Sequence, residues 1–262
     1  MNRLTNDLNF LINLQKMSWK SFLVYRVQAL TWIFANLLVI LNSIIAITVI
    51  YTVSSGIPGW SYFQVLALSS ITTMMFGIVD YMVAPWNIAR RLRVGSMDTW
   101  FTKPYSYFMI LSGGFGMVWN SASFISGLAL FTYSVMQLNI TAIQFLYFAL
   151  LFAAGTTAFL MFFIMMSIVS YHLMKSGHFI DNMESMLSNA GVYPLSVYGV
   201  LGQIIFTLAM PVGIAYYYPA EALLGMIGPV AVVAALLLAA VITFVSRKVF
   251  YRLLRDYSSG GG

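Results

Sequence analysis

Charged and aromatic side chains are concentrated in one short stretch, residues 89–104, which we call the basic hinge. It reads Ala-Arg-Arg-Leu-Arg-Val-Gly-Ser-Met-Asp-Thr-Trp-Phe-Thr-Lys-Pro. Aromatic side chains beside arginines are typical of surfaces that bind another protein. The same residues are equally consistent with arginines that anchor a membrane helix and aromatic rings at the level of the lipid headgroups. The chemistry indicated here is recognition of a partner or of lipid.

The residue order predicts two helices separated by a turn. Pro85 ends or kinks the helix before the hinge because it lacks an N–H group. Gly95 favours a left-handed helix stop, Ser96 is suited to cap a new helix, and Asp98 would lie in the favourable first turn of that helix. Pro104 ends it, so the second helix is short and should expose its aromatic pair. We expect a docking surface made of Arg90, Arg91, Arg93, Ser96, Met97, Asp98, Trp100, Phe101 and Lys103.

The rest of the sequence holds no recognisable catalytic or metal-binding motif. It has no Gly-x-x-x-x-Gly-Lys-Ser/Thr loop for nucleotide phosphates, no His-Glu-x-x-His and no Gly-x-Ser-x-Gly. The lack of cysteine excludes thiol nucleophiles and thiolate ligands. His172 and His178 have no carboxylate spaced with the pair on one helical face, so we interpret them as interfacial histidines. We therefore expect no catalytic residue, metal or cofactor in this chain, and ATP could drive it only through another chain.

Asp80 is the one carboxylate expected within a membrane helix. A charge there is costly and by default indicates function. Its position near the cytoplasmic end of the helix would also let it reach water or pair with Arg90 or Arg91, and we favour this structural interpretation.

Two prolines and one glutamate mark irregular places in the apolar segments. Pro211 interrupts the fifth apolar segment and, like Pro85, is a candidate hinge. Glu221 fits the first turn of a short outer helix that Pro219 begins and Gly225 stops. Large apolar side chains that could face a transport pathway, or simply pack against other helices or lipid, are Tyr133, Met136, Phe162, Met166, Phe206 and Met210.

Composition places the chain in a membrane. Hydrophobic residues make up 61% of its 262 residues and charged residues only 8%, whereas soluble domains carry about 25% charged residues. The net charge of +6 indicates contact with anionic lipid headgroups and not with nucleic acid. Since a helix needs about 20 apolar residues to cross a bilayer, we expect an all-α polytopic membrane protein. Its six transmembrane helices should lie near residues 27–53, 63–86, 105–136, 142–174, 192–215 and 226–248.

The basic residues predict the topology of this single membrane domain. All 13 Lys and Arg residues lie before the first span or after the second, fourth and sixth, and none lies in the loops near 54–62, 137–141 and 216–225. The positive-inside rule therefore places both termini in the cytoplasm. Residues 1–26 show apolar side chains at helical spacing, which predicts an amphipathic interfacial helix, with a frayed tail as the alternative. Residues 249–262 are expected to form a cytoplasmic tail.

A dispersed set of motifs over nearly the whole chain resembles the six-helix permease subunits of ABC-2-type transporters. The residues that carry the resemblance are Arg93, Gly95, Asp98, Lys103 and Pro104 in the hinge, Gly-Ile-Pro-Gly-Trp at 56–60, Tyr-Pro-Leu-Ser-Val-Tyr at 193–198, Pro211, Pro219 and the closing Arg-Asp-Tyr-Ser-Ser-Gly-Gly at 255–261. The resemblance also implies that the terminal glycines are native, although an added tail would look the same.

The resemblance implies a transport function. Permeases of this family pair with a separate P-loop ATPase subunit, which holds ATP and Mg²⁺, and with a second permease chain that is identical or related. Residues 96–102 would then form the coupling helix that the ATPase grips, and the short helix between the fifth and sixth spans would be a re-entrant outer helix. The family further implies an exporter in the plasma membrane, and the scarcity of charge within the spans favours a hydrophobic or amphipathic cargo such as a drug, lipid or peptide. A secondary transporter or channel, or less readily a membrane-embedded enzyme, remains as the alternative.

Overall fold

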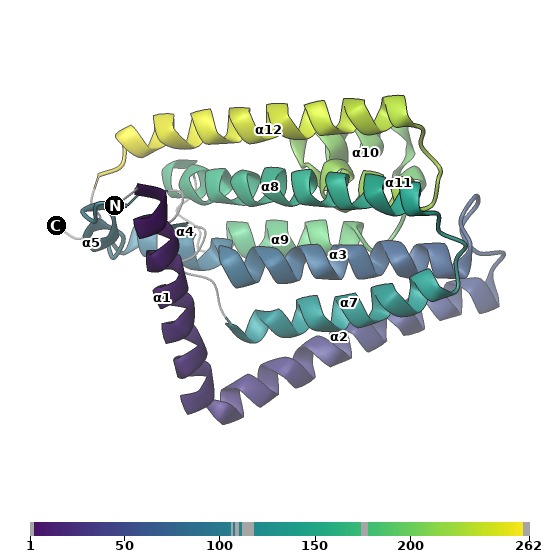
Figure 1. Cartoon of the computed structure of the whole chain (residues 1–262), viewed down its shortest axis with the longest axis horizontal. Coiled ribbons are helices and arrows are strands. Elements are labelled where there is room, and N and C mark those ends of the chain that lie inside the picture. The colour runs from purple at the N-terminus through teal and green to yellow at the C-terminus, as the bar shows by residue number, and fades with distance from the viewer. Residues whose placement is uncertain (1–2, 106, 108–109, 112–117, 174–177, 259–262) are drawn as a thin grey trace.

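The computed structural model describes residues 3–105, 107, 110–111, 118–173 and 178–258, and throughout this part of the chain the regular structure is helical (Figure 1). The helices are α1 (Arg3–Val24), α2 (Arg26–Val53), α3 (Tyr62–Met82), α4 (Pro85–Arg93), α5 (Asp98–Phe101), the 3₁₀ turn η1 (Val118–Asn120), α7 (Ser121–Met136), α8 (Ala142–Leu173), α9 (Phe179–Ala190), the 3₁₀ turn η2 (Leu195–Tyr198), α10 (Gly199–Ile204), the π-helical segments η3 (Ile205–Ala209) and η4 (Gly213–Tyr217), α11 (Tyr218–Leu223) and α12 (Pro229–Arg255).

Four helical segments of the described chain are long and apolar enough to cross a membrane. They are α2, α3 together with α4, α8, and α12. They correspond to the predicted first, second, fourth and sixth spans. The predicted third span is described only in part, where α7 contributes 16 residues; residues 106, 108–109 and 112–117 lie outside the described residues. Helix α12 continues to Arg255, so the first half of the predicted tail, residues 249–255, is helical.

The central helix α3 packs against α7, and α8 packs against α12 (Figure 1). Glycines allow the first contact: a Cβ atom at Gly77 would lie 2.9 Å from the Cα atom of Phe124, and one at Gly127 would lie 2.9 Å from the backbone nitrogen of Met74. Small residues of this kind let membrane helices approach closely. The core between α3 and α8 is aromatic, since Phe159 and Phe163 are fully buried.

The N-terminal helix α1 runs across the ends of the other helices at a steep angle to them (Figure 1). It is a regular helix from Arg3 to Val24, so the alternative of a frayed tail is wrong. The ring of Phe10 stacks on Tyr105, with the ring centroids 3.9 Å apart. This arrangement suits a helix that lies along the membrane surface beside the basic hinge.

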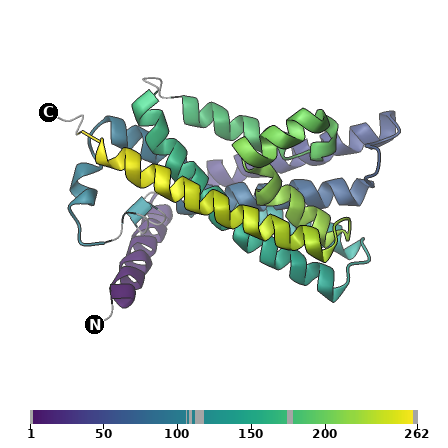
Figure 2. The same ribbon diagram turned by 90° about the horizontal axis from the view of Figure 1, so that it is seen from above.

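The predicted fifth span is wrong as a single helix over 192–215. The chain instead forms α9 from Phe179, bends by 109° before the Leu195–Ala209 segment, and turns back toward α12 (Figure 2). The bend is held by hydrogen bonds from Thr72 Oγ1 to the Gly191 carbonyl at 2.6 Å and from the Tyr216 hydroxyl to the Leu187 carbonyl at 2.7 Å. Buried partners that are distant in sequence therefore override the apolar pattern.

Pro211 separates the two π-helical segments η3 and η4. Met210 before it is extended, with φ −127° and ψ 103°, as expected for a residue that precedes proline. The interruption predicted at Pro211 is thus confirmed. The short helix α11 is confirmed as well, because Glu221 lies in its first turn and Gly225 after it has φ +68°.

Candidate functional site

The basic hinge is a folded unit at the end of the bundle where α12 also ends (Figure 1). Pro85 is the first residue of α4, and Ala84 before it has a left-handed φ of +44°, so α3 and α4 meet at a kink. Gly95 has φ +69°, which confirms the predicted helix stop. Asp98 begins α5, which is only four residues long.

The predicted capping role of Ser96 is wrong. Its hydroxyl lies 3.5 Å from the Arg91 carbonyl of the preceding helix, and α5 begins only at Asp98 without a side-chain cap. The tight turn between the two helices points the Ser96 side chain backwards, toward α4.

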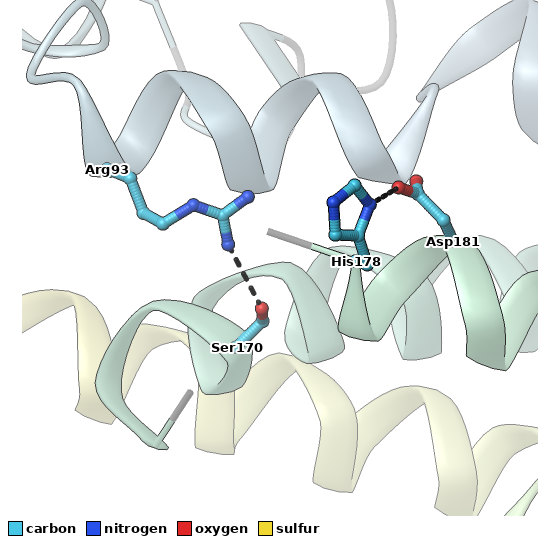
Figure 3. Close-up of polar contacts among 4 residues, drawn as sticks. All are labelled: Arg93, Ser170, His178 and Asp181. Atoms are coloured by element: carbon cyan, nitrogen blue, oxygen red, sulfur yellow. Dashed lines mark hydrogen bonds and ion pairs between the residues drawn. The ribbon is translucent and has the colours of Figure 1, made fainter. Parts of the chain in front are cut away.

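The three arginines of the hinge have different surroundings. Arg90 Nη2 and Arg91 Nε donate to Asn87 Oδ1 at 3.4 and 3.2 Å, and Asn87 is buried. Arg93 Nη1 donates to Ser170 Oγ of α8 at 3.5 Å, as Figure 3 shows. The Arg90 side chain is exposed, whereas Arg91 and Arg93 are partly buried. The last arginine therefore connects the hinge to the C-terminal end of α8.

The aromatic pair of the hinge is partly buried, so the expectation that it is exposed is wrong. Phe101 packs edge-on against Tyr107 and Tyr257, with ring centroids 5.2 and 5.7 Å away. Lys103 lies over the Trp100 ring, with its Nζ atom 3.8 Å from the ring centroid. This is cation–π geometry. Met97, between the two helices, is fully buried. The rings thus hold the hinge together, while Arg90 and Lys103 remain exposed.

The segment after α12 folds over the hinge, and we call residues 256–258 the C-terminal strap. The Tyr257 hydroxyl lies 3.0 Å from Asp98 Oδ1 and 3.2 Å from the Leu92 carbonyl oxygen, and it donates its proton to these acceptors. Burial, and then the hydrogen bond to the Asp98 carboxylate and its charge, raise the pKa of Tyr257 above its ordinary value. The phenol therefore stays protonated and remains a donor at neutral pH.

Two further contacts fasten the strap and the end of α12 to α8. The Tyr171 hydroxyl donates to the Ser258 carbonyl at 2.6 Å, and His172 Nε2 lies 2.9 Å from the Leu253 carbonyl. The sequence interpretation missed the role of Tyr257. The closing motif at 255–261 is the signal that could have drawn attention to it.

The predicted pathway residues do not form one group. Phe162 and Met166 of α8 line a cavity of about 290 Å³ together with Met210. Phe206 packs against the ring of Tyr198 at 5.2 Å. On α7, Tyr133 and Met136 are exposed by 52% and 76% and do not line that cavity.

Neither histidine belongs to a group of metal ligands among the described residues. His172 binds the backbone near the end of α12. His178 is exposed, and its Nδ1 lies 3.6 Å from Asp181 Oδ2 (Figure 3), a neighbouring carboxylate that the sequence interpretation overlooked. In the described ranges, no three His, Asp or Glu side chains are grouped so that they could hold a metal ion.

Asp80 does not pair with Arg90 or Arg91 as the structural interpretation proposed. Those arginines bind Asn87, and the Asp80 carboxyl group instead interacts with the carboxyl group of Glu184 on α9. Sequence reasoning did not single out Glu184, because the broken path of the chain brings α9 beside α3.

A family model described as ABC-2 family transporter protein matches residues 37–261. Neither the curated proteins nor the solved structures contain a match.

Proposed function

We propose, from the premise that this chain belongs to the ABC-2 transporter family, that it is the permease half of an ATP-driven exporter. As a member, it is an integral membrane protein and a permease of an ABC transporter. ATP and Mg²⁺ would be held by a separate P-loop ATPase subunit, which would dock on the basic hinge. The sequence has no phosphate-binding loop. This supports ATP binding by a separate subunit.

The observation that carries the proposal is the set of contacts from the hinge to three membrane helices. Helix α4 continues α3 beyond the kink at Pro85, Arg93 reaches α8, and Tyr257 joins the hinge to the end of α12. A displacement of the packed hinge would be transmitted to each helix that the hinge contacts. A soluble motor that grips the hinge could therefore move several transmembrane segments together.

The outward side of the hinge has the character of a docking surface. Arg90, Val94, Thr99 and Lys103 are exposed, and Val94 is exposed by 63%. Exposed basic groups around a small apolar contact favour rapid and oriented association with an acidic partner surface. The coupling helix expected over residues 96–102 corresponds to the turn at Ser96 and Met97 followed by α5.

A second permease chain, identical or related, completes the proposed exporter in the plasma membrane. Nearly all of the most apolar part of α2 is left unburied by the rest of the chain, so this helix has a long surface for lipid or for the second permease. The few charges in the spans support a hydrophobic or amphipathic cargo.

The docking role is tested by charge reversal at exposed positions. The full-length chain is purified from its native membrane, and mass spectrometry identifies the P-loop ATPase that accompanies it. Changing Arg90→Glu together with Lys103→Glu should reduce recovery of the ATPase by at least about tenfold, because two attractive contacts become repulsive. Arg93→Glu is less suitable, since Arg93 is partly buried and connects the hinge to α8.

The matched control is Arg247→Glu with Lys248→Glu, which reverses two exposed charges on α12 and should leave ATPase recovery unchanged. Equal recovery with the hinge variant and the wild type would refute docking at this surface. Transport by the purified chain alone, without an ATPase, would favour a secondary transporter or channel.

A further inference from the structure

A cavity of about 490 Å³ lies between α2, α3, α7 and α9. Its described lining includes Asp80, Asp181 and Glu184, which are three of the seven acidic residues in the chain, and no lysine or arginine. Such a concentration is unusual in a protein with 8% charged residues and a net charge of +6. The cavity thus concentrates acidic side chains in an otherwise basic molecule.

Two carboxyl groups in this cavity are buried and incompletely paired. Asp80 and Glu184 interact with each other, yet Asp80 Oδ1 and Glu184 Oε1 are both buried without a hydrogen-bond partner among the described residues. Buried polar atoms in native proteins almost always have a partner. Two adjacent carboxyl groups therefore call for a proton or a cation between or beside them.

Among the described residues, no ion pair joins Asp80 or Glu184 to a basic side chain. Asp181 lies toward the surface, with its side chain 47% exposed, and its neighbour is His178 at 3.6 Å. Arg90 and Arg91 donate to Asn87. Arg93 donates to Ser170.

The remaining walls suit an organic cation. Trp32 of α2 and Phe76 of α3 line the cavity, and aromatic faces attract cations as well as apolar groups. Val39 and Ile40 add aliphatic contacts, and the rest of the lining is polar or acidic. The cavity therefore offers both apolar surface and polar groups to a small organic ligand.

A second cavity neighbours the first. This cavity of about 450 Å³ shares Val39, Thr73, Ser188 and Asn189 with the first and adds Asn42 and Ser43 of α2. Polar side chains of α2, α3 and α9 therefore line two neighbouring cavities, one of which contains the carboxyl pair.

We propose that the Asp80–Glu184 pair binds the cationic group of an amphipathic molecule, whose apolar part lies against Trp32 and Phe76. The inference rests on the proposed function, because it makes this site the place where an exporter recognises its cargo. A lipid with an ammonium headgroup would offer the same chemistry as a cationic drug or peptide.

The test uses two probes of nearly equal size and opposite charge, tetraphenylphosphonium and tetraphenylborate. Their equilibrium binding is measured on the full-length purified chain in nanodiscs of phosphatidylglycerol, without ATP. Asp80→Asn with Glu184→Gln should weaken phosphonium binding at least about tenfold, as expected when a buried charge pair is lost, and should not weaken borate binding. Asp256→Asn removes an exposed carboxylate outside the cavity and is the matched control.

A second measurement tests the site on the unaltered chain, so that it does not depend on the folding of a variant. A hydrophobic carbodiimide modifies buried carboxyl groups, and mass spectrometry reports the modification of Asp80 and Glu184. Tetraphenylphosphonium should protect both residues, whereas tetraphenylborate should not. Protection by nanodiscs that contain phosphatidylethanolamine, with no probe added, would identify a lipid amine as the cation and also support the site.

Equal binding of both probes, unchanged phosphonium affinity in the double variant, or no protection would overturn the proposal and leave the pair with only a shared proton. Loss of ATPase co-purification with intact phosphonium binding would instead contradict the proposed function alone. The two failures are therefore distinguishable.

Discussion

At the scale of single residues, Tyr257 makes the contact on which the geometry of the hinge depends. Its ring packs against Phe101 and its hydroxyl binds Asp98 and the Leu92 carbonyl. Asp98 and Gly95 have the local backbone roles that their residue types predict. The partner of Asp98 is 159 residues away in the sequence, and no local pattern identifies it.

The change Tyr257→Phe removes the hydroxyl and keeps the ring. Because the contact is partly exposed, we expect a loss of about 1 kcal/mol of hinge stability. Amide hydrogen exchange of residues 95–102 should accelerate about fivefold. Asp98→Asn and the double variant complete a double-mutant cycle, in which simple additivity would show that the two side chains are not coupled.

The raised pKa of Tyr257 also predicts a dependence on pH. The folded state holds the phenolic proton more tightly than the unfolded state. The contribution of the strap is therefore fully present below about pH 10 and is lost as the pH rises through the folded pKa. Hydrogen exchange rates, corrected for their intrinsic pH dependence, should show no change in hinge protection between neutral pH and pH 9.

At the scale of elements, the α3–α7 contact shows how a membrane helix pair depends on glycine. A Cβ atom at Gly77 would meet the backbone of Phe124, and backbone cannot move aside as a flexible side chain can. The apolar pattern predicts both helices, but it does not predict which face of each meets the other.

We expect Gly77→Ala to destabilise the protein by about 1–3 kcal/mol through overpacking. Thermal unfolding in detergent micelles measures the effect. Gly228→Ala is the control, because a Cβ atom there would have no neighbour within 4 Å. Equal melting temperatures for the two variants would show that the helices separate without cost.

The helix α9 and the bend that joins it to the fifth apolar segment are what sequence reasoning missed. The composition of that segment is that of a membrane helix, yet Gly191 is packed against Thr72 and Tyr216, and a bend results. Proline alone indicated the later interruption at residue 211. The bend before Leu195 depends on partners in α3 and η4, which a local apolar pattern does not contain.

At the scale of the whole molecule, the predicted arrangement of six spans with both termini in the cytoplasm can be tested directly. The chain has no cysteine, so single cysteines can be introduced without background labelling. Ser54→Cys and Asn139→Cys should react with a membrane-impermeant maleimide added to intact cells. Thr99→Cys should react only after the membrane is permeabilised. Labelling of Thr99→Cys in intact cells would show that the predicted topology is inverted.

The sequence by itself determined that this protein lies in a membrane, where its long helices run, where the hinge turns, and which family it resembles. These properties follow from hydrophobicity, charge and backbone preference, which act within a few residues. Only the tertiary structure decided that Tyr257 closes over Asp98 and that Asp80 meets Glu184. Those contacts arise when packed helices bring distant residues together, and burial then makes a shared hydrogen bond or charge decisive.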